Sequence, residues 1–243
     1  MDPLILIPAR YASTRFPGKP LAEIAGKTLL RRVWEQCAPV LGPERVVVAT
    51  DDDRIRAHCA EHGMRYVLTP DTCPTGTDRI AAAAESLQAE LYVNVQGDEP
   101  LVDPADIEHV IQSTRRAPGE IINAYCAIDS DHDYRSRTLP KVVMRPDGRL
   151  LYMSRAPIPG DKDDTFRQAW KQVCIYGFPP EALRAYAECG QKTDLEAIED
   201  IEILRFLELG YEVTMVPVSA SSIAVDTPED VKRVERALED HDG

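Results

Sequence analysis

Short apolar runs alternate with amphipathic segments along the first half of the chain. The runs are rich in branched side chains and short enough for buried strands, whereas the segments between them carry apolar residues at helical spacing. We expect strands at residues 4–7, 44–50, 64–69 and 89–100, and helices at 26–40, 53–63, 76–88 and 103–116. This alternation predicts an α/β fold, a predominantly parallel sheet with helices on both faces and right-handed crossovers.

The second half of the chain is less regular. Expected strands lie at 121–128, 140–159 (a hairpin), 173–178 and 211–218, and expected helices at 179–189, 194–210 and 226–240. Trp170, in the polar segment before the third of these strands, is expected to be exposed. No low-complexity linker or repeat divides the chain, so we expect a single domain, 1–243, with a smaller β-rich inserted lobe at about 120–180.

The chain is acidic overall. Its 41 Asp and Glu residues outnumber its 28 Lys and Arg residues, which gives a formal net charge of −13. Such a chain repels polyanions, so we expect no general nucleic-acid binding, and any phosphate site must be a local cationic pocket. No apolar run reaches the roughly 18 residues of a membrane span, and no signal peptide is visible. We therefore expect no membrane partner and a cytoplasmic protein.

Cysteine and histidine give no clear metal pattern. The six cysteines form no CxxC pair, and no histidine lies at zinc spacing from them, so reduced and mostly buried thiols are expected. His58, His62, His109 and His132 fall on helices or loops without a paired ligand, and we expect them to be solvated or to cap helices.

A cationic loop follows the first expected strand. In PARYASTRFPGKP, residues 8–20, the cations Arg10, Arg15 and Lys19 stand among small residues. Small residues let backbone N–H groups approach a phosphate, and a guanidinium can bind one through two hydrogen bonds. The loop lacks both GxxxxGK(S/T) and GxGxxG, which argues against an ATPase P-loop and a dinucleotide site. An anion-binding loop and a solvated surface loop both fit this composition.

Two aspartates stand where apolar runs end. Asp98 follows the glycine of NVQGDEP, and Asp226 follows the apolar residues of AVDTPED. Ligands of such sheets bind beyond the carboxyl ends of the strands, and Mg²⁺ prefers carboxylate oxygens. Simpler roles are also open, because Asp98 suits a turn that caps the following helix and Asp226 suits an N-cap.

Seven motifs occur in one order over nearly the whole chain: IPARYASTRFPGKPL, VATDD, GTDR, NVQGDEP, SRAPIP, IYGF and VDTPEDV. Together they resemble the CMP-Kdo synthetase family, the 3-deoxy-manno-octulosonate cytidylyltransferases, and more distantly the CMP-sialate synthetases. The resemblance implies a Rossmann-like nucleotidyltransferase fold, a homodimer, and CTP and Mg²⁺ as requirements. The implied reaction converts CTP and a 3-deoxy-2-keto acid sugar into CMP-sugar and pyrophosphate, for surface polysaccharide synthesis.

The same resemblance assigns roles on the nucleotide side. Arg10, Arg15 and Lys19 would hold the triphosphate of CTP, and Asp98 and Asp226 would carry the Mg²⁺. The anomeric hydroxyl would attack the α-phosphorus in line, with Lys19 and metal offsetting the charge, and Asp98 or a metal-bound hydroxide would take the proton. The expected catalytic residues are Lys19, Arg10 and Asp98. Further nucleotide contacts are expected at Thr75, Gly76 and Arg79, since PTGTDR resembles the family's loop near the cytosine.

The acid-sugar side departs from the family pattern. Gln172 stands where the family has His, and Cys174 stands where it has Gly. Ile203 replaces a Gln, and it cannot form the hydrogen bonds that Gln172 still can. The expected sugar contacts are Arg155, which suits the substrate carboxylate, Gln172, Tyr176 and Glu202.

Two interpretations of these departures stay open. The acid sugar differs from Kdo in one substituent, for instance an amino-bearing or more apolar analogue, or the helix register shifts and Glu199 or Asp200 supplies the contact. Wider alternatives for the acceptor are a nonulosonic acid or another hydroxy or phosphono acid.

Overall fold

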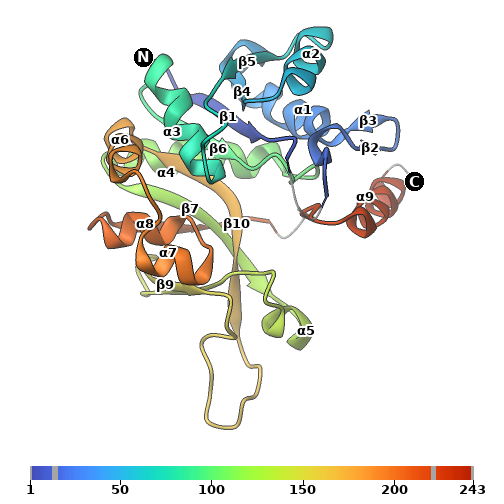
Figure 1. The fold of residues 1–243 in the computed structure, drawn as a ribbon. Helices are drawn as coiled ribbons and strands as arrows, with labels where there is room; N and C mark the ends of the chain where they lie inside the picture. Colours follow the sequence, from blue (N-terminus) through green and yellow to red (C-terminus); the bar gives the residue numbers. More distant parts are fainter. Residues whose placement is uncertain (1, 13–15, 220–222, 242–243) are drawn as a thin grey trace.

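The computed structural model describes residues 2–12, 16–219 and 223–241 (Figure 1). Within them, nine strands form one sheet in the order β11-β7-β10-β6-β1-β4-β5, with β8 paired to β10 and β9 to β8. The strands are β1 (Leu4–Ala9), β4 (Val46–Thr50), β5 (Arg65–Leu68), β6 (Tyr92–Val95), β7 (Ile121–Ile128), β8 (Lys141–Met144), β9 (Leu150–Ser154), β10 (Ala169–Phe178) and β11 (Val213–Pro217).

Helices cover both faces of this sheet, as the alternating pattern predicts (Figure 1). They are α1 (Leu29–Leu41), α2 (Asp53–Glu61), α3 (Gly76–Ser86), α4 (Pro104–Arg116), α5 (Asp131–Arg135), α6 (Pro180–Cys189), α7 (Asp194–Glu199), α8 (Ile203–Glu208) and α9 (Pro228–His241). Of the helices in the described part of the chain, none is long and apolar enough to cross a bilayer.

Alternate residues of each central strand enter different cores. Ile5 and Ile7 of β1 pack with residues of α1, α2 and α4 on one face, whereas Leu4 and Leu6 pack with α3, α6 and α8 on the other. Successive side chains of a strand point to opposite faces, so a strand that is buried on both sides reads as the continuous apolar run seen in the sequence.

Strand direction divides the sheet into a parallel part and a mixed part. β6, β1, β4 and β5 pair in parallel, as do β11 and β7. β10 runs antiparallel between β6 and β7 and joins these two parallel groups. The sheet is therefore mostly parallel, and the carboxyl ends of β1, β4 and β6 lie at one edge.

Three local expectations are wrong. The helix expected at 194–210 is two helices, because Asp200 adopts a left-handed conformation with φ of 52° and ends α7; aspartate tolerates that conformation, and helical spacing of apolar residues does not reveal it. Trp170 is half-buried in β10 against the second core rather than exposed. The start of the helix expected at 26–40 forms a hairpin of β2 (Glu23–Ile24) and β3 (Lys27–Thr28), and α1 begins after Thr28, its N-cap.

The region from β8 to β10 extends beyond the central sheet. β8 and β9 form a hairpin against the start of β10, and the chain between β9 and β10 projects away from the body (Figure 1). β7 and β10 run from the central sheet into this region. That residues 120–180 act as a distinct lobe of a single domain stays a prediction.

Gly177 of β10 offers a direct test of packing between the sheet and α4. A methyl group there would overlap the hydroxyl of Thr114, whose side chain is buried and bonded to the carbonyl of Val110. We expect Gly177→Ala to lower the free energy of unfolding by about 1–3 kcal/mol through overpacking. In urea denaturation, Thr114→Ala should relieve part of this loss in the double variant, and strictly additive effects of the two substitutions would contradict the packing explanation.

Candidate active site

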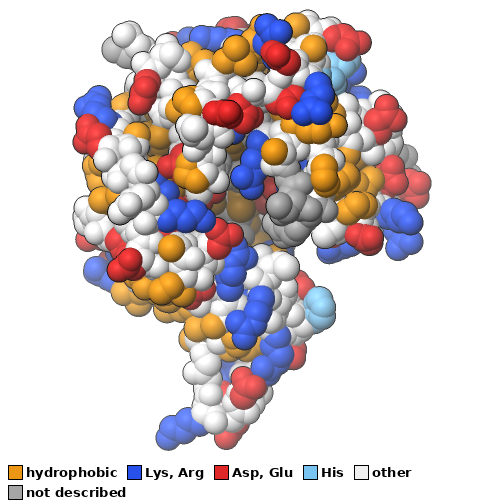
Figure 2. Space-filling view, viewed as in Figure 1, with side chains coloured by type: hydrophobic (Ala, Val, Ile, Leu, Met, Phe, Trp, Pro, Cys, Tyr) orange, Lys and Arg blue, Asp and Glu red, His pale blue; other side chains and the backbone are white. Residues whose placement is uncertain are grey.

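The loops that follow β1, β4 and β6 meet at the carboxyl edge of the parallel strands. This edge is where sheets of this class bind ligands. The loop after β1 leads into a 3₁₀ helix, η1 (Lys19–Leu21), and the loop after β6 carries Asp98. Figure 2 shows a hollow near the centre of this face with blue Lys and Arg side chains beside it.

The ammonium of Lys19 joins three distant segments at this edge. Its Nζ lies 2.8 Å from Asp98 Oδ2 and 3.6 Å from Asp226 Oδ1. It also donates to the carbonyl oxygen of Val225 at 2.8 Å, and the backbone N–H of Val225 donates to the carbonyl oxygen of Asp98 at 2.9 Å. The structure thus brings together Lys19, Asp98 and Asp226, which the sequence placed in one site.

This cluster is partly open to solvent and carries a net negative charge. The side chains of Lys19, Asp98 and Asp226 are 17%, 27% and 32% exposed. Two carboxylates against one ammonium leave one negative charge uncompensated among these three groups. Because Mg²⁺ takes carboxylate oxygens and keeps its other positions for water or phosphate, Asp98 and Asp226 could hold it.

Gly97 explains how Asp98 reaches this position. A Cβ at Gly97 would lie 2.8 Å from the carbonyl oxygen of Pro8, closer than real Cβ atoms approach backbone. Only glycine therefore lets the loop after β6 pass this near the end of β1. The close approach puts Asp98 beside the segment that carries Lys19.

Arg10 and Arg15 are the remaining cations of the basic loop. Arg10 follows β1 directly and is exposed. Arg15 lies outside the described residues. The tight turn between them and η1 depends on Gly18, whose φ is 73° and whose N–H donates to the carbonyl of Tyr11 at 2.9 Å.

Thr75 and Gly76 form the start of α3. Thr75 is its N-cap in a capping box with Asp78, and the backbone N–H groups of Gly76 and Thr77 donate to the carboxylate of Glu202, at 3.2 and 2.8 Å. A carboxylate at a helix N-terminus is favourable because the helix dipole is positive there. Glu202, predicted from the sugar side, thus contacts the loop predicted from the nucleotide side.

The pKa of Glu202 lies above its usual value. Burial is the largest cause, and the hydrogen bonds from Thr77 and Gly76 oppose it in part. Burial disfavours the charged form of this carboxyl group, whereas the hydrogen bonds from the two N–H donors favour it.

Arg79 is buried and paired. Its guanidinium lies 3.2 Å from Asp51 Oδ2, donates to Thr69 Oγ1 at 2.6 Å, and is 3% exposed. It therefore ties α3 to the loops that follow β4 and β5. Its role as a nucleotide contact stays a prediction.

A buried ionic network joins α3 to α7 and α8. Its acidic members, Asp78 and Glu196, were not predicted from the sequence. Arg205 of α8 is fully buried and contacts Glu196 Oε2 at 2.5 Å and Asp78 Oδ1 at 2.9 Å. Its guanidinium also lies 3.6 Å from the ring centre of Tyr186. Asp78 and Glu196 each stand at the third position of a helix whose N-cap is threonine, and this capping-box spacing is the signal that could have indicated them.

Arg155 is held by backbone carbonyl oxygens. Its guanidinium donates to those of Glu199 at 2.6 Å, Asp200 at 2.8 Å and Arg137 at 3.1 Å. The Glu199 carboxylate in turn accepts from the Arg155 N–H at 2.9 Å and from Ser154 Oγ at 2.6 Å. Within the described residues, no hydrogen bond links Arg155 to the Lys19 cluster, and its contact with a substrate carboxylate stays a prediction.

Gln172 and Tyr176 lie on β10 on either side of an irregularity in its pairing with β7. Gln172 donates to Asn123 Oδ1 at 2.9 Å, and the Asn123 amide donates to the carbonyls of Val173 and Ile175 at 3.1 and 3.0 Å. A pocket beside this point is lined by Glu99, Cys126, Leu139, Lys171, Gln172, Val173, Ser219 and Ala224. Tyr176 is 5% exposed, and burial raises its pKa well above the usual value.

Ile203 does not line this region. It is 1% exposed and belongs to the hydrophobic core that α8 shares with β10. An apolar side chain at this position is therefore explained by core packing.

Comparison with known proteins identifies the class of enzyme. A family model described as Cytidylyltransferase matches residues 4–215. The chain is 38% identical to a 3-deoxy-manno-octulosonate cytidylyltransferase of Protochlamydia amoebophila, over 96% of this chain and 93% of the relative. It is likewise 38% identical to an 8-amino-3,8-dideoxy-manno-octulosonate cytidylyltransferase of Shewanella baltica, over 98% and 99%.

A solved structure agrees in fold. The structure of a CMP:2-keto-3-deoxy-manno-octonic acid synthetase complexed with CTP has a TM-score of 0.91 and 33% identity, covering 99% of this chain and 100% of that one. The chain therefore belongs to the cytidylyltransferase family and, within it, to the 3-deoxy-manno-octulosonate cytidylyltransferases.

The buried network gives a stability prediction. We expect Arg205→Met to lower the free energy of unfolding by about 3–5 kcal/mol, because the fully buried Glu196 would lose the partner of its charge. Urea denaturation would measure the change. Arg184→Met is the matched control, since Arg184 is exposed on α6 and should change stability by less than about 0.5 kcal/mol. Equal effects of the two substitutions would contradict this account.

Proposed function

We propose that this cytidylyltransferase transfers CMP from CTP to the anomeric hydroxyl of 3-deoxy-manno-octulosonate (Kdo) and releases pyrophosphate. The observation that carries the proposal is the meeting of Lys19, Asp98 and Asp226 at the carboxyl edge of the parallel strands. The full-length similarity to enzymes named for this sugar supports the choice of acceptor.

On the nucleotide side, Arg10, Arg15 and Lys19 bind the triphosphate of CTP. The chain is strongly acidic overall, so these cations provide the local positive charge that a polyanion requires. Lys19 already forms a short ion pair with Asp98, which fixes its ammonium at the strand edge. Thr75, Gly76 and Arg79 contribute near the base through the start of α3.

Asp98 and Asp226 hold the Mg²⁺ of this reaction. Two partly exposed carboxylates that both lie beside the ammonium of Lys19 provide the oxygen ligands that a hard cation prefers. When bound, the metal supplies positive charge to the phosphoryl oxygens. The chain's own contribution is the placement of Lys19, which offsets the charge that develops as the anomeric hydroxyl attacks the α-phosphorus in line.

The acceptor contacts are Arg155, Gln172, Tyr176 and Glu202. Gln172 lines the pocket beside β10 together with Lys171 and Glu99. An amino-bearing Kdo is a second candidate acceptor, because Gln172 stands where the family has His and because a relative at 38% identity is named for 8-amino-3,8-dideoxy-manno-octulosonate. The departures from the family pattern at Gln172 and Ile203 both suggested a modified acceptor. Because Ile203 lies in the core, only the departure at Gln172 still supports it.

We further propose that the enzyme is a cytoplasmic homodimer that supplies lipopolysaccharide or capsule synthesis. Two exposed apolar side chains on adjoining elements support the dimer: Leu151 of β9 and Ile198 of α7 are 56% and 79% exposed. The two elements adjoin, because Tyr152 and Ser154 bond to Glu199, and orange side chains gather over them in Figure 2. Large exposed apolar groups on one face are typical of an interface.

Pyrophosphate release tests the reaction. With CTP, Mg²⁺ and Kdo, we expect release that depends on Kdo and falls by roughly 100-fold or more in Asp98→Asn, because the site loses a carboxylate aimed at the metal and at Lys19. Asp53→Asn is the matched control, since Asp53 is 85% exposed on α2. Circular dichroism would establish that both variants are folded.

The same assay separates the two acceptors. Higher turnover of the 8-amino analogue than of Kdo would favour the second candidate. If neither sugar gives pyrophosphate release while calorimetry still detects CTP binding, both proposed acceptors are wrong. The assignment of CTP as the nucleotide would then still stand.

Sedimentation velocity tests the dimer. We expect Leu151→Glu and Ile198→Glu to convert the dimer into a monomer, because each places a charge in the buried part of the interface. Leu68→Glu is the matched control, since Leu68 on β5 has the same 56% exposure as Leu151. A monomeric parent protein, or a dimer that survives both substitutions, would refute this interface.

A further inference from the structure

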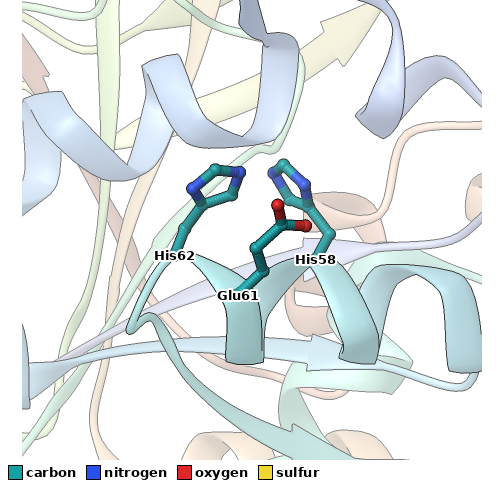
Figure 3. A group of neighbouring side chains, drawn as sticks. All are labelled: His58, Glu61 and His62. Carbon is teal, nitrogen blue, oxygen red and sulfur yellow. The ribbon is translucent and has the colours of Figure 1, made fainter.

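One polar cluster lies outside the proposed active site. His58, Glu61 and His62 stand on α2 and its C-cap, and one ligand atom from each lies within 4.8 Å of the others. Figure 3 shows the three side chains converging on one side of the helix. From the sequence, which shows no paired ligand for them, these histidines are expected to be solvated or to cap helices.

Helical geometry explains the convergence. Residues three and four apart lie on the same face of a helix, so His58, Glu61 and His62 are neighbours. The N–H of His62 donates to the carbonyl of His58 at 3.1 Å, which keeps the helical relationship up to the last ligand. The two imidazole rings have centroids 4.4 Å apart and an interplanar angle of 68°.

We propose that His58, Glu61 and His62 form a binding site for a divalent transition metal ion, and that Zn²⁺ is the ion it binds best. Two imidazoles and one carboxylate are a three-ligand set that zinc accepts, with water in the fourth position. Metal–ligand bonds of roughly 2.0–2.2 Å require donor atoms closer together than 4.8 Å, so small side-chain rotations complete the site. Imidazole ligands select zinc, nickel, cobalt or copper over Mg²⁺.

The surroundings favour a cation in three ways. The site is at the C-terminal end of α2, where the helix dipole is negative. Nε2 of His58 lies 2.8 Å from Thr28 Oγ1, so one ring nitrogen has a fixed partner and the other is left for the metal. Burial, and to a smaller degree His62, lowers the pKa of His58, which keeps the imidazole neutral near pH 7.

One neighbouring charge acts against the metal. Arg31 of α1 acts on His58 electrostatically, but its guanidinium is paired with Glu35 at 2.9 Å. Glu61 as a ligand offsets one of the two positive charges of Zn²⁺, and the ion pair with Glu35 offsets the charge of Arg31. The motif order His-x-x-Glu-His also occurs on the zinc-binding helix of one class of metallopeptidase.

Calorimetric titration of ZnCl₂ into the chelator-treated full chain tests this site. The buffer contains saturating Mg²⁺, so that Asp98 and Asp226 do not compete for zinc. We expect one zinc per chain, at least tenfold weaker binding in His62→Gln, and a smaller loss in Glu61→Gln. His132→Gln is the matched control, because His132 is 91% exposed on α5 and should leave zinc binding unchanged.

Thermal unfolding gives a second measurement. At free zinc about a hundredfold above its Kd, the melting temperature should rise by roughly 5–11 °C in the parent and in His132→Gln, but not in His62→Gln. Melting in chelator alone would establish that all variants fold. No zinc binding in the parent, or binding that His62→Gln leaves intact and thus belongs to the cysteines or another site, would overturn the proposal.

Discussion

The ion pair between Lys19 and Asp98 is the contact on which the active-site assignment depends. One ammonium contacts a carboxylate after β6, a carbonyl just before α9 and, more distantly, a second carboxylate in the same segment. The sheet brings the first two loops to one edge, and the backbone bond between Val225 and Asp98 fastens the third segment to them. Without the close approach at Gly97, this geometry would not exist.

The Lys19 cluster is partly exposed to solvent, whereas a second ionic network, around Arg205, is buried. The two have different roles. Arg205, Asp78 and Glu196 are buried or nearly so and joined by short bonds. Burying such charges is rarely a gain in stability over apolar packing, so their arrangement is better understood as fixing geometry. Together with Glu202, the network holds the N-terminus of α3, the element that carries Thr75 and Gly76, against α8.

The sequence was sufficient to locate the strands of the first half and to predict that Asp98 and the basic loop lie at one edge of the sheet. Apolar runs gave β1, β4, β5 and β6, and strand ends located Asp98 and the basic loop because parallel strands share one edge. The break at Asp200 was invisible, since it depends on one left-handed residue whose neighbours are compatible with a continuous helix. The antiparallel direction of β10 could not be predicted from the local sequence pattern, because strand direction follows from tertiary connections rather than from residue spacing. Arg79 and Arg155 are predicted ligand contacts through the family resemblance, and in the folded chain both also bond to neighbouring loops, which spacing along the sequence does not reveal.

The span of the Lys19 contacts has a consequence for the growing chain. Lys19 and Val225 are 206 residues apart, so a ribosome adding roughly 5–20 residues per second needs on the order of 10–40 s to supply the second after the first. During that interval, the amino-terminal half can form β1, β4, β5 and β6 with their helices, but the cluster lacks its last carboxylate. A nascent chain can therefore be largely folded before the Lys19 cluster is complete, and it completes the cluster only when the segment before α9 has been released.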